Sequence, residues 1–568
     1  MDVTNTIIAR NVANGTGNDL GGDFNGSTFT YNLIEDTSGA SNLTLSDENI
    51  TGVDPQLLPL ADNGGSTQTH ALRSTSPALN TGNSTLATDQ RGFSRGFFPD
   101  IGAFEEIPES RLIPDSDEGT VVQEFALSFT SIPQGLNVGA IDTSSILQAF
   151  HSQLRAALAS ENTTEAVSWV ELMFCEEFEE QKCGGTDNDE DIVENIRATL
   201  KYITRETKTN PVIVYAISFP EQLELVLVTP EDRILHKVIS EANSARVQRM
   251  AANLRQNVVN TRRPNAYRPA SRQLYQWLIA PIAPELEKLA VDTLIFSLDE
   301  GLRGIPLAAL RDEEQFLVEK YSLGVIPSVS LTNTRYTPLQ NPRVLAMGAS
   351  EFEQYDPLPA VPVELSLITE KLAEGVSILD RDFTFDNLRA NSRARNHQIL
   401  HLATHADFQA GDKDNAHIQL WNDKLAFDRL RELGWTQENP IELLVLSACR
   451  TALGDLDAEL GFAGLAVNTG AKSALASLWY VSDGGTLNLM SKFYRHLQDP
   501  DITIKAEALR RAQIDMLRGE GQNEEFWQEI ARSPDLAPDS KAFLEGFSDR
   551  DFTHPYYWSA FTLVGSPW

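Results

Sequence analysis

At 568 residues with 41% hydrophobic side chains, the chain is long enough for roughly three or four domains with sizeable cores. Its formal net charge of −34 at pH 7 excludes nucleic acid and anionic membranes as expected partners, because both repel an acidic surface. The sequence contains no apolar run of about 18 residues, so it predicts no membrane span. The N-terminus shows no basic and apolar segments of a signal peptide.

The three cysteines are too few for a disulfide-stapled scaffold. Cys175 and Cys183 are close enough in sequence to form one bridge, or they are two unrelated thiols. Cys449 is then left over, as either a reactive nucleophile or an inert core residue would be.

Residues 1–104 are rich in Asn, Gly, Thr, Ser and Asp, and contain brief strand-like runs without a helical period. Short strands between turns are typical of the stacked coils of a β-solenoid, so this segment is expected to be all-β. Residues 105–122 carry prolines and acidic residues and are expected to form a linker.

The end of that first segment resembles a known family. GVDPQLLPLADNGGSTQTHALRSTSPALNTGN, followed by DQRGFSRGFFPDIGAFE, is similar to the C-terminal end of bacterial right-handed parallel β-helix proteins that are secreted or lie at the surface. That family has the signature D-Q-R-G followed by D-I-G-A-F-E, which here corresponds to residues 89–92 and 100–105. The resemblance implies the last coils and cap of a truncated solenoid, serving either surface display or no binding role of its own.

From Ser144 onward the pattern changes to helices alternating with apolar strands. We expect a helical and strand region over 123–270 and a larger domain over 271–568. Such alternation predicts an α/β fold with a mostly parallel sheet flanked by helices.

Two strands of this domain end in reactive side chains. Ile399 to Phe408 reads ILHLATHADF and includes His405, whereas Leu443 to Thr451 reads LLVLSACRT and includes Cys449. If the two strands are neighbours, their carboxyl ends bring imidazole and thiol to one edge of the sheet. An imidazole there could accept the thiol proton and later protonate a leaving amine.

Other interpretations of these residues were weighed. His401 and His405 have the spacing of a zinc pair on a helix, but HLATH lacks the glutamate of HExxH and follows a strand pattern. No metal or other cofactor is therefore expected. His401 is expected to be a packed strand residue, and Cys449 would by default be a buried core cysteine.

Six segments together resemble one family. HLATHADF, LSACRTALGD, AELGFAGLA, SALASLWYVSD, FYRHL and KAEALRRAQ are similar, in order and spacing, to the CHAT domain, a caspase-like peptidase module related to separases and caspases. The resemblance implies a dyad in which His405 is the general base and Cys449 the nucleophile. It also implies an oxyanion site formed by the backbone N–H groups of Cys449 and Ala406, the latter a glycine in many relatives.

Substrate residues follow from the same resemblance. Asp483, at the end of SALASLWYVSD, is the candidate for holding a basic P1 side chain, Arg or Lys, although it could also be a solvated loop carboxylate. Asp455 is a further candidate, and Ser477 and Trp479 lie on the segment 477–481 to which a peptide strand would add.

The resulting hypothesis is a caspase-like cysteine endopeptidase that acts on protein or peptide substrates, with an activating protein partner as an option. The alternatives are a non-catalytic surface or scaffolding protein and a self-processing peptidase. A β-helix end favours the cell surface or secretion, whereas a free nucleophilic thiol is more easily kept reduced in the cytoplasm.

Overall fold

The structure is a computed structural model that divides into two compact units, residues 1–118 and 119–568. It describes residues 2–105 and 143–568, except for 12–18, 46–48, 62, 64–66, 74–75, 80, 82–87, 92–99, 178–188, 232, 353–354, 394–396, 409–416, 422, 427, 434–440, 452–469, 521–523 and 535. Only the backbone is described at 2, 143–148, 189–191, 393, 407–408, 428, 431 and 448–451.

The first unit is built from short parallel strands. Its strands are β1 (Asp2–Thr4), β2 (Ile7–Ile8), β3 (Gly21–Asp23), β4 (Thr28–Thr30), β5 (Leu33–Ile34), β6 (Gly39–Ser41) and β7 (Ile50–Thr51). The pairs β1–β4, β2–β5, β5–β7 and β3–β6 are all parallel. The buried side chains of Phe29, Leu33 and Ile34 pack inside. The expected all-β N-terminal segment is therefore present.

Residues of the expected signature meet in a hydrogen-bonded cluster at the end of this unit. The buried Asp89 carboxylate accepts bonds from Arg91 Nε at 2.8 Å and from the Glu105 N–H at 2.9 Å. These bonds outweigh burial, which by itself would raise the pKa, so the pKa of Asp89 is lowered. The Arg91 guanidinium also lies 3.6 Å from the centroid of the Phe104 ring. The cluster ties residues 89–91 to residues 104–105.

The second unit contains one large sheet, with thirteen strands among the described residues. Along the sheet the order is β10-β9-β8-β11-β12-β20-β19-β18-β15-β13-β14, and the hairpin β16–β17 is attached to β15. The strands are β8 (Pro211–Ser218), β9 (Leu223–Val228), β10 (Ile234–Ile239), β11 (Thr293–Leu298), β12 (Ser322–Ile326), β13 (Arg343–Gly348), β14 (Glu374–Leu379), β15 (Ile399–Phe408), β16 (His417–Gln419), β17 (Lys424–Ala426), β18 (Leu443–Thr451), β19 (Ser473–Ser477) and β20 (Phe561–Gly565).

The direction of the strands reverses in the middle of the sheet. Strands β8, β11, β12 and β20 are mutually parallel, and so are β19, β18, β15, β13 and β14, but β20 and β19 are antiparallel. The sheet therefore consists of two mostly parallel halves that run in opposite directions, with β9 antiparallel to β8 and β10 in one half and β16 antiparallel to β15 in the other. The carboxyl ends of β13, β15 and β18 lie at the same edge.

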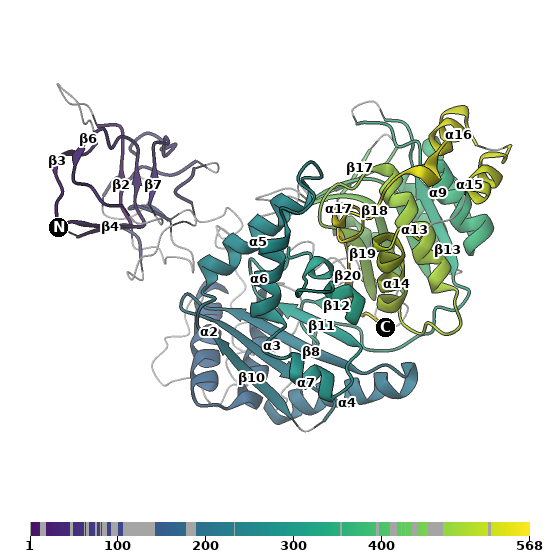
Figure 1. Cartoon of the computed structure of the whole chain (residues 1–568), viewed down its shortest axis with the longest axis horizontal. Helices are drawn as coiled ribbons and strands as arrows, with labels where there is room; N and C mark the ends of the chain where they lie inside the picture. The colour runs from purple at the N-terminus through teal and green to yellow at the C-terminus, as the bar shows by residue number, and fades with distance from the viewer. Residues whose placement is uncertain are drawn as a thin grey trace, which may run out of the picture. The chain divides into compact units, whose positions relative to one another are not determined.

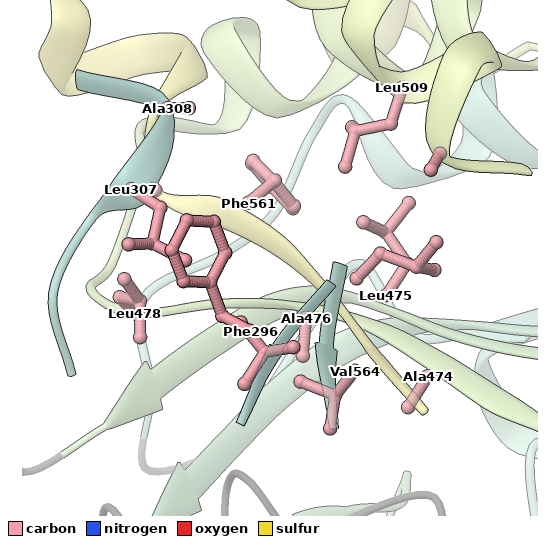
Figure 2. Close-up of a cluster of buried hydrophobic side chains, with 14 of the residues drawn as sticks. Phe296, Leu307, Ala308, Ala474, Leu475, Ala476, Leu478, Leu509, Phe561 and Val564 are labelled. Atoms are coloured by element: carbon pink, nitrogen blue, oxygen red, sulfur yellow. The ribbon is translucent and has the colours of Figure 1, made fainter. Parts of the chain in front are cut away.

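A hydrophobic cluster fills the place where the two halves meet. Phe296 of β11, Leu475 of β19 and Val564 of β20 lie close to Leu307 and to Leu509 (Figure 2). All five side chains are at most 4% exposed. Removing large apolar groups from water is the main stabilising term in folding, so this cluster holds the two halves together.

Helices flank the sheet, as Figure 1 shows. They are α2 (Thr143–Ala159), α3 (Thr163–Glu177), α4 (Asp189–Thr207), α5 (Ser244–Val258), α6 (Arg268–Leu278), α7 (Ala283–Lys288), α8 (Leu317–Lys320), α9 (Val361–Ser366), α10 (Phe385–Arg393), α13 (Asp483–Leu497), α14 (Lys505–Leu517), α15 (Glu524–Ala531), α16 (Pro538–Leu544) and α17 (Pro555–Trp558). Short turns of 3-10 helix include η2 (Leu307–Ala309), η4 (Asp380–Asp382), η6 (Asp428–Leu433) and η7 (Phe547–Asp549), and the π-helical turn η3 (Leu367–Leu372) continues α9. The predicted mostly parallel sheet flanked by helices is confirmed.

The expected ranges 123–270 and 271–568 share this one sheet. Strand β8, from the first range, pairs along its length with β11, from the second. Each residue of β8 is buried, as expected for a central strand covered on both faces. The two ranges therefore form a single unit, and the expected linker at 105–122 lies outside the described residues apart from Glu105.

Two further expectations concern cysteines and membranes. Cys175, buried in α3, is disulfide-bonded. Cys183 lies outside the described residues, so a Cys175–Cys183 bridge stays a prediction.

Among the helices that the structure describes, none combines the length and the apolar composition needed to cross a bilayer.

A buried lysine in the core gives a pH-dependent prediction. Lys505 is 2% exposed, and burial lowers its pKa to about 7, with Glu442 opposing and Lys472 reinforcing the shift. Between pH 7 and about 10.5 the unfolded chain holds a proton that the folded chain lacks, so the free energy of unfolding rises with pH in this window. We expect Lys505→Met to raise the free energy of unfolding near pH 7 by about 1–4 kcal/mol and to flatten this rise.

Urea unfolding at pH 6, 7.5 and 9 measures this effect. Tryptophan fluorescence reports on the second unit alone, because the first tryptophan in the sequence is Trp169. Lys201→Met, at an exposed position of α4, is the control. It should change neither the free energy of unfolding near pH 7 nor its rise with pH. If the free energy of unfolding of Lys505→Met still rose with pH as in the wild type, a group other than Lys505 would be the cause of the rise.

Candidate active site

The strands that carry His405 and Cys449 are neighbours, as predicted. β15 and β18 are parallel, with His405 opposite Ala448 and Ala406 opposite Cys449. The pairing is irregular between Leu402 and His405, directly before the site. The backbones of His405 and Cys449 therefore lie within one residue of the same register. The side chain of Cys449 lies outside the described part of the chain, and so does Asp455.

The imidazole of His405 is half-buried and has a defined hydrogen-bond partner. Its Nε2 lies 2.9 Å from the backbone oxygen of Asp356, in the segment that follows β13. Because a carbonyl oxygen can only accept, Nε2 carries the proton in this arrangement. In the neutral ring Nδ1 is then the nitrogen that can accept a proton.

Three aromatic rings surround this imidazole. Tyr355 is stacked on it with a centroid distance of 5.0 Å, and Phe352 meets it edge-on at 4.8 Å. Tyr480 is stacked at 6.4 Å and is 40% exposed. Burial, together with Asp483, Tyr556 and Asp356, raises the pKa of Tyr480. The rings restrict the rotation of the imidazole and shield it from water on these sides.

Sequence reasoning missed these aromatic residues and the Asp356 carbonyl. The segment EFEQYDP follows the short apolar strand RVLAMG with two residues between them. A loop at the carboxyl end of a strand next to β15 belongs to the same edge as the site. This position in the fold could have pointed to Phe352 and Tyr355. The role of a backbone carbonyl cannot be read from the sequence, because every residue has one.

Ala406 lies inside the ladder. It is opposite Ile418 of β16 on one side and Cys449 of β18 on the other, and its φ is not in the positive range. The backbone N–H of such a residue lies in the plane of the sheet and points to one of the two neighbouring strands. An oxyanion role for this N–H stays a prediction, and it requires the end of β15 to release the group from the ladder.

Asp483 is the first residue of α13, whose N-cap Ser482 accepts a bond from the Gly485 N–H at 3.3 Å. The carboxylate is half-buried and accepts a bond from the Ala360 N–H at 2.7 Å. Burial raises the pKa of Asp483 to about 7, with the Ala360 bond opposing the shift and Glu364 adding to it. Within the described residues no ion pair involves Asp483, and a role in binding substrate stays a prediction.

Ser477 and Trp479 are more buried than a direct contact with substrate would require. Ser477 is 1% exposed and pairs with Phe561 of β20. Trp479 is 5% exposed and its indole N–H donates to the Tyr556 carbonyl at 3.0 Å. Pairing with β20 therefore already occupies the start of segment 477–481, to which a peptide strand was expected to add. Within this segment the exposed side chain is Tyr480. The substrate-binding role of both residues stays a prediction.

His401 belongs to a different, fully buried cluster. Its Nδ1 lies 3.1 Å from the Tyr494 hydroxyl, and its Nε2 lies 3.0 Å from a carboxylate oxygen of Glu364. Burial, with Glu364, raises the pKa of Tyr494 well above its usual value. His401 and His405 therefore have separate partners on one strand. In the described part of the chain no group of three or more His, Cys, Asp and Glu side chains is close enough to hold a metal.

Comparison with protein families gives one match. The model of the CHAT domain matches residues 268–566, which is more than half of the chain. The chain belongs to the CHAT domain family. The match spans β11 to β20 and therefore includes His405, Cys449 and Asp483. A search of curated proteins found no match for this CHAT protein.

Solved structures similar to this CHAT protein include a separase–securin complex and gingipains. A Saccharomyces cerevisiae separase–securin complex aligns with TM-score 0.41 and 10% identity, covering 78% of this chain and 35% of that one. The Arg-specific cysteine proteinase gingipain R aligns with TM-score 0.31 and 11% identity, covering 55% and 69%. A complex of Porphyromonas gingivalis RgpB pro- and mature domains aligns with TM-score 0.30, 11% identity and coverage of 55% and 71%. This chain spans about a third of the length of the separase chain.

Proposed function

We propose that this CHAT protein is a cysteine endopeptidase with Cys449 as nucleophile and His405 as general base. The observation that carries the proposal is the orientation of His405. Its Nε2 proton is bonded to the Asp356 carbonyl, and it lies on the strand adjacent to the one that carries Cys449. This arrangement leaves Nδ1 as the basic nitrogen at the edge where the cysteine strand ends.

The reaction would proceed in two steps. The thiol of Cys449 passes its proton to His405 Nδ1, and the thiolate sulfur attacks the carbonyl carbon of the scissile peptide bond. The C–N bond breaks, His405 returns the proton to the departing amine, and a thioester remains. Water then adds to the thioester with His405 as base, which releases the carboxylic acid and restores the thiol. No cofactor is needed.

Backbone N–H groups of Cys449 and Ala406 are the proposed donors to the oxyanion. Such donors matter because they stabilise charge that develops only in the transition state. The position of Ala406 between two strands implies that substrate binding opens the ladder at this point.

The proposed substrate is a peptide with a basic P1 residue. Asp483 supplies a carboxylate beyond the carboxyl end of β19, and Asp483 and Asp356 both lie near the exposed Tyr480, whose ring stacks on the imidazole. Asp455 is proposed to contribute further negative charge. A guanidinium or ammonium group would be attracted to such a site, whereas a carboxylate would be repelled.

A peptide library tests this preference. We expect cleavage after Arg or Lys, and kcat/KM for a P1-Arg peptide at least about 100-fold above that of the matched P1-Asp peptide. Liquid chromatography with mass spectrometry identifies the cleaved bonds. Cleavage after Asp in preference to Arg would contradict the acidic pocket.

For the first unit we propose the end of a right-handed β-helix. Parallel pairing supports this, since Asp2, Val3 and Thr4 lie opposite Thr28, Phe29 and Thr30, as in successive coils of a solenoid. The bonded cluster around Asp89 would close the last coil. In the related bacterial proteins such a unit is at the surface, so we propose surface display of the peptidase, with a protein partner as an option for its activation.

A further inference from the structure

The loop after β13 is fixed at both ends by carboxylates. At its start, the Ser350 N–H and hydroxyl donate to Asp380 Oδ1 at 2.7 and 3.0 Å, and the Ser350 carbonyl accepts from the Leu358 N–H at 2.9 Å. At its end, the Ala360 N–H donates to Asp483 Oδ2 at 2.7 Å. The second anchor joins residues that are 123 positions apart in the sequence.

Between these anchors the loop contacts the imidazole of His405. The Asp356 carbonyl accepts the Nε2 proton at 2.9 Å, and the neighbouring Tyr355 ring stacks on the imidazole. The Tyr355 hydroxyl also lies 3.4 Å from His417 Nε2. A change in the position of this loop would therefore change both the tautomer and the orientation of the general base.

Two charged side chains, Glu364 and Arg550, influence the ionisation of the Asp483 carboxylate. Glu364 on α9 destabilises its charge, Arg550 after η7 stabilises it, and Tyr480 lies nearby. Glu364 is in turn paired with His401. Burial has the largest effect, and the pKa of Asp483 is raised to about 7. An ionised carboxylate accepts a shorter and stronger hydrogen bond than a neutral one.

We propose that Asp483 is a positioning residue that couples the P1 pocket to the general base. Its carboxylate holds the Ala360 end of the loop, and the loop holds His405 through the Asp356 carbonyl. The inference rests on the proposed peptidase function and deepens it. A basic P1 side chain keeps Asp483 ionised, which strengthens the bond to Ala360 and fixes the imidazole for proton transfer.

This coupling makes P1 binding affect turnover as well as affinity. A site that only attracts a cation would change KM, because its interaction is the same in the ground state and the transition state. A residue that also positions the base changes kcat. Arginine at P1 is therefore expected to give a higher kcat than citrulline, its neutral isostere, in addition to a lower KM.

Two substitutions of Asp483 separate charge from hydrogen bonding. Asn keeps an oxygen that can accept from the Ala360 N–H, whereas Ala keeps neither the charge nor the acceptor. We expect both variants to lose the preference for Arg over citrulline. On the citrulline peptide, kcat of Asp483→Ala should be about 10- to 100-fold below that of Asp483→Asn. Equal kcat values for the two variants would overturn the proposal.

A third variant removes the other partner of the bond. Ala360→Pro deletes the N–H, and the φ of −76° at this position suits proline. We expect this variant to retain selectivity for Arg, because Asp483 keeps its charge, and to lose kcat by a similar factor. Retention of full kcat would contradict the proposal. Melting temperatures identify any variant that fails to fold. The variants that do fold still test whether Asp483 positions His405.

A spectroscopic measurement does not depend on turnover. Long-range 1H–15N spectra of the full chain labelled with 15N-histidine report the tautomer of each of its nine histidines, and the signal absent from His405→Gln identifies His405. We expect the Nε2–H tautomer in wild type and in Asp483→Asn, and a mixture in Asp483→Ala. The same tautomer in all three would refute the positioning role even if the protein cleaves peptides. A shifted tautomer in a protein that cleaves nothing would support it and refute the peptidase function instead.

Discussion

Cys449→Ala is expected to lower kcat/KM for a P1-Arg peptide on the order of 10⁴-fold or more, because no other group at this edge of the sheet is proposed to form the thioester. His405→Ala should cause a loss of similar size. Since nucleophile and base act as one unit, the double variant should lose little more than either single variant. Initial rates with a fluorogenic peptide measure these effects.

Mass spectrometry of the wild type beside Cys449→Ala separates the remaining functions. Cleavage that depends on Cys449 but is confined to the protein's own chain would indicate self-processing. The absence of any Cys449-dependent cleavage would favour a binding or scaffolding role. Full cleavage by Cys449→Ala would refute the assignment of the nucleophile. Iodoacetamide labelling of residue 449 in the wild type provides a control for access to the thiol.

Glu171→Ala is expected to lower the free energy of unfolding of the second unit by about 3–5 kcal/mol. Glu171 is 1% exposed in α3 and accepts hydrogen bonds from the Tyr215 hydroxyl at 2.6 Å, the Val329 N–H at 3.0 Å and the Ser330 N–H and hydroxyl at 2.9 and 2.7 Å. Removing the carboxylate leaves these buried donors without their acceptor. The side chain therefore joins α3 both to β8 and to the segment after β12.

Denaturant unfolding followed by tryptophan fluorescence gives the size of this loss. Glu171→Gln keeps one carbonyl oxygen and should lose less than Glu171→Ala. Glu206→Ala in α4 is a matched control, because both side chains of its ion pair with Arg205 are exposed and the pair should be worth less than about 1 kcal/mol. A loss in Glu171→Ala no larger than in this control would show that water replaces the carboxylate at little cost.

Much of the local structure could be predicted because its causes lie within short segments. The near-continuous apolar runs at 399–403 and 443–446 favour buried strands, and the structure has them in β15 and β18. The helix over residues 385–393 begins after Thr384, a residue type that commonly caps helices, and its hydroxyl accepts from the Asn387 N–H. Periodicity and capping are properties of neighbouring residues, so the sequence displays them directly.

The surroundings of His405 could not be derived in that way. Its hydrogen-bond partner is a backbone carbonyl 49 residues upstream, and every residue type has such a group. Likewise, a family resemblance predicted that Asp483 holds a basic P1 side chain, but its bond to the Ala360 N–H depends on the packing of α13 beside α9. Long-range backbone contacts have no side-chain signature, and only the folded chain reveals them.

By itself, the sequence indicated two buried strands that carry His405 and Cys449 near their carboxyl ends, because apolar runs are a local property. Tertiary structure decided that these strands are adjacent, that the last strand β20 inserts between β12 and β19, and that one loop fixes the tautomer of the imidazole. These features depend on which distant segments bury their apolar surfaces against one another. That pairing is determined cooperatively by the packing of the whole core.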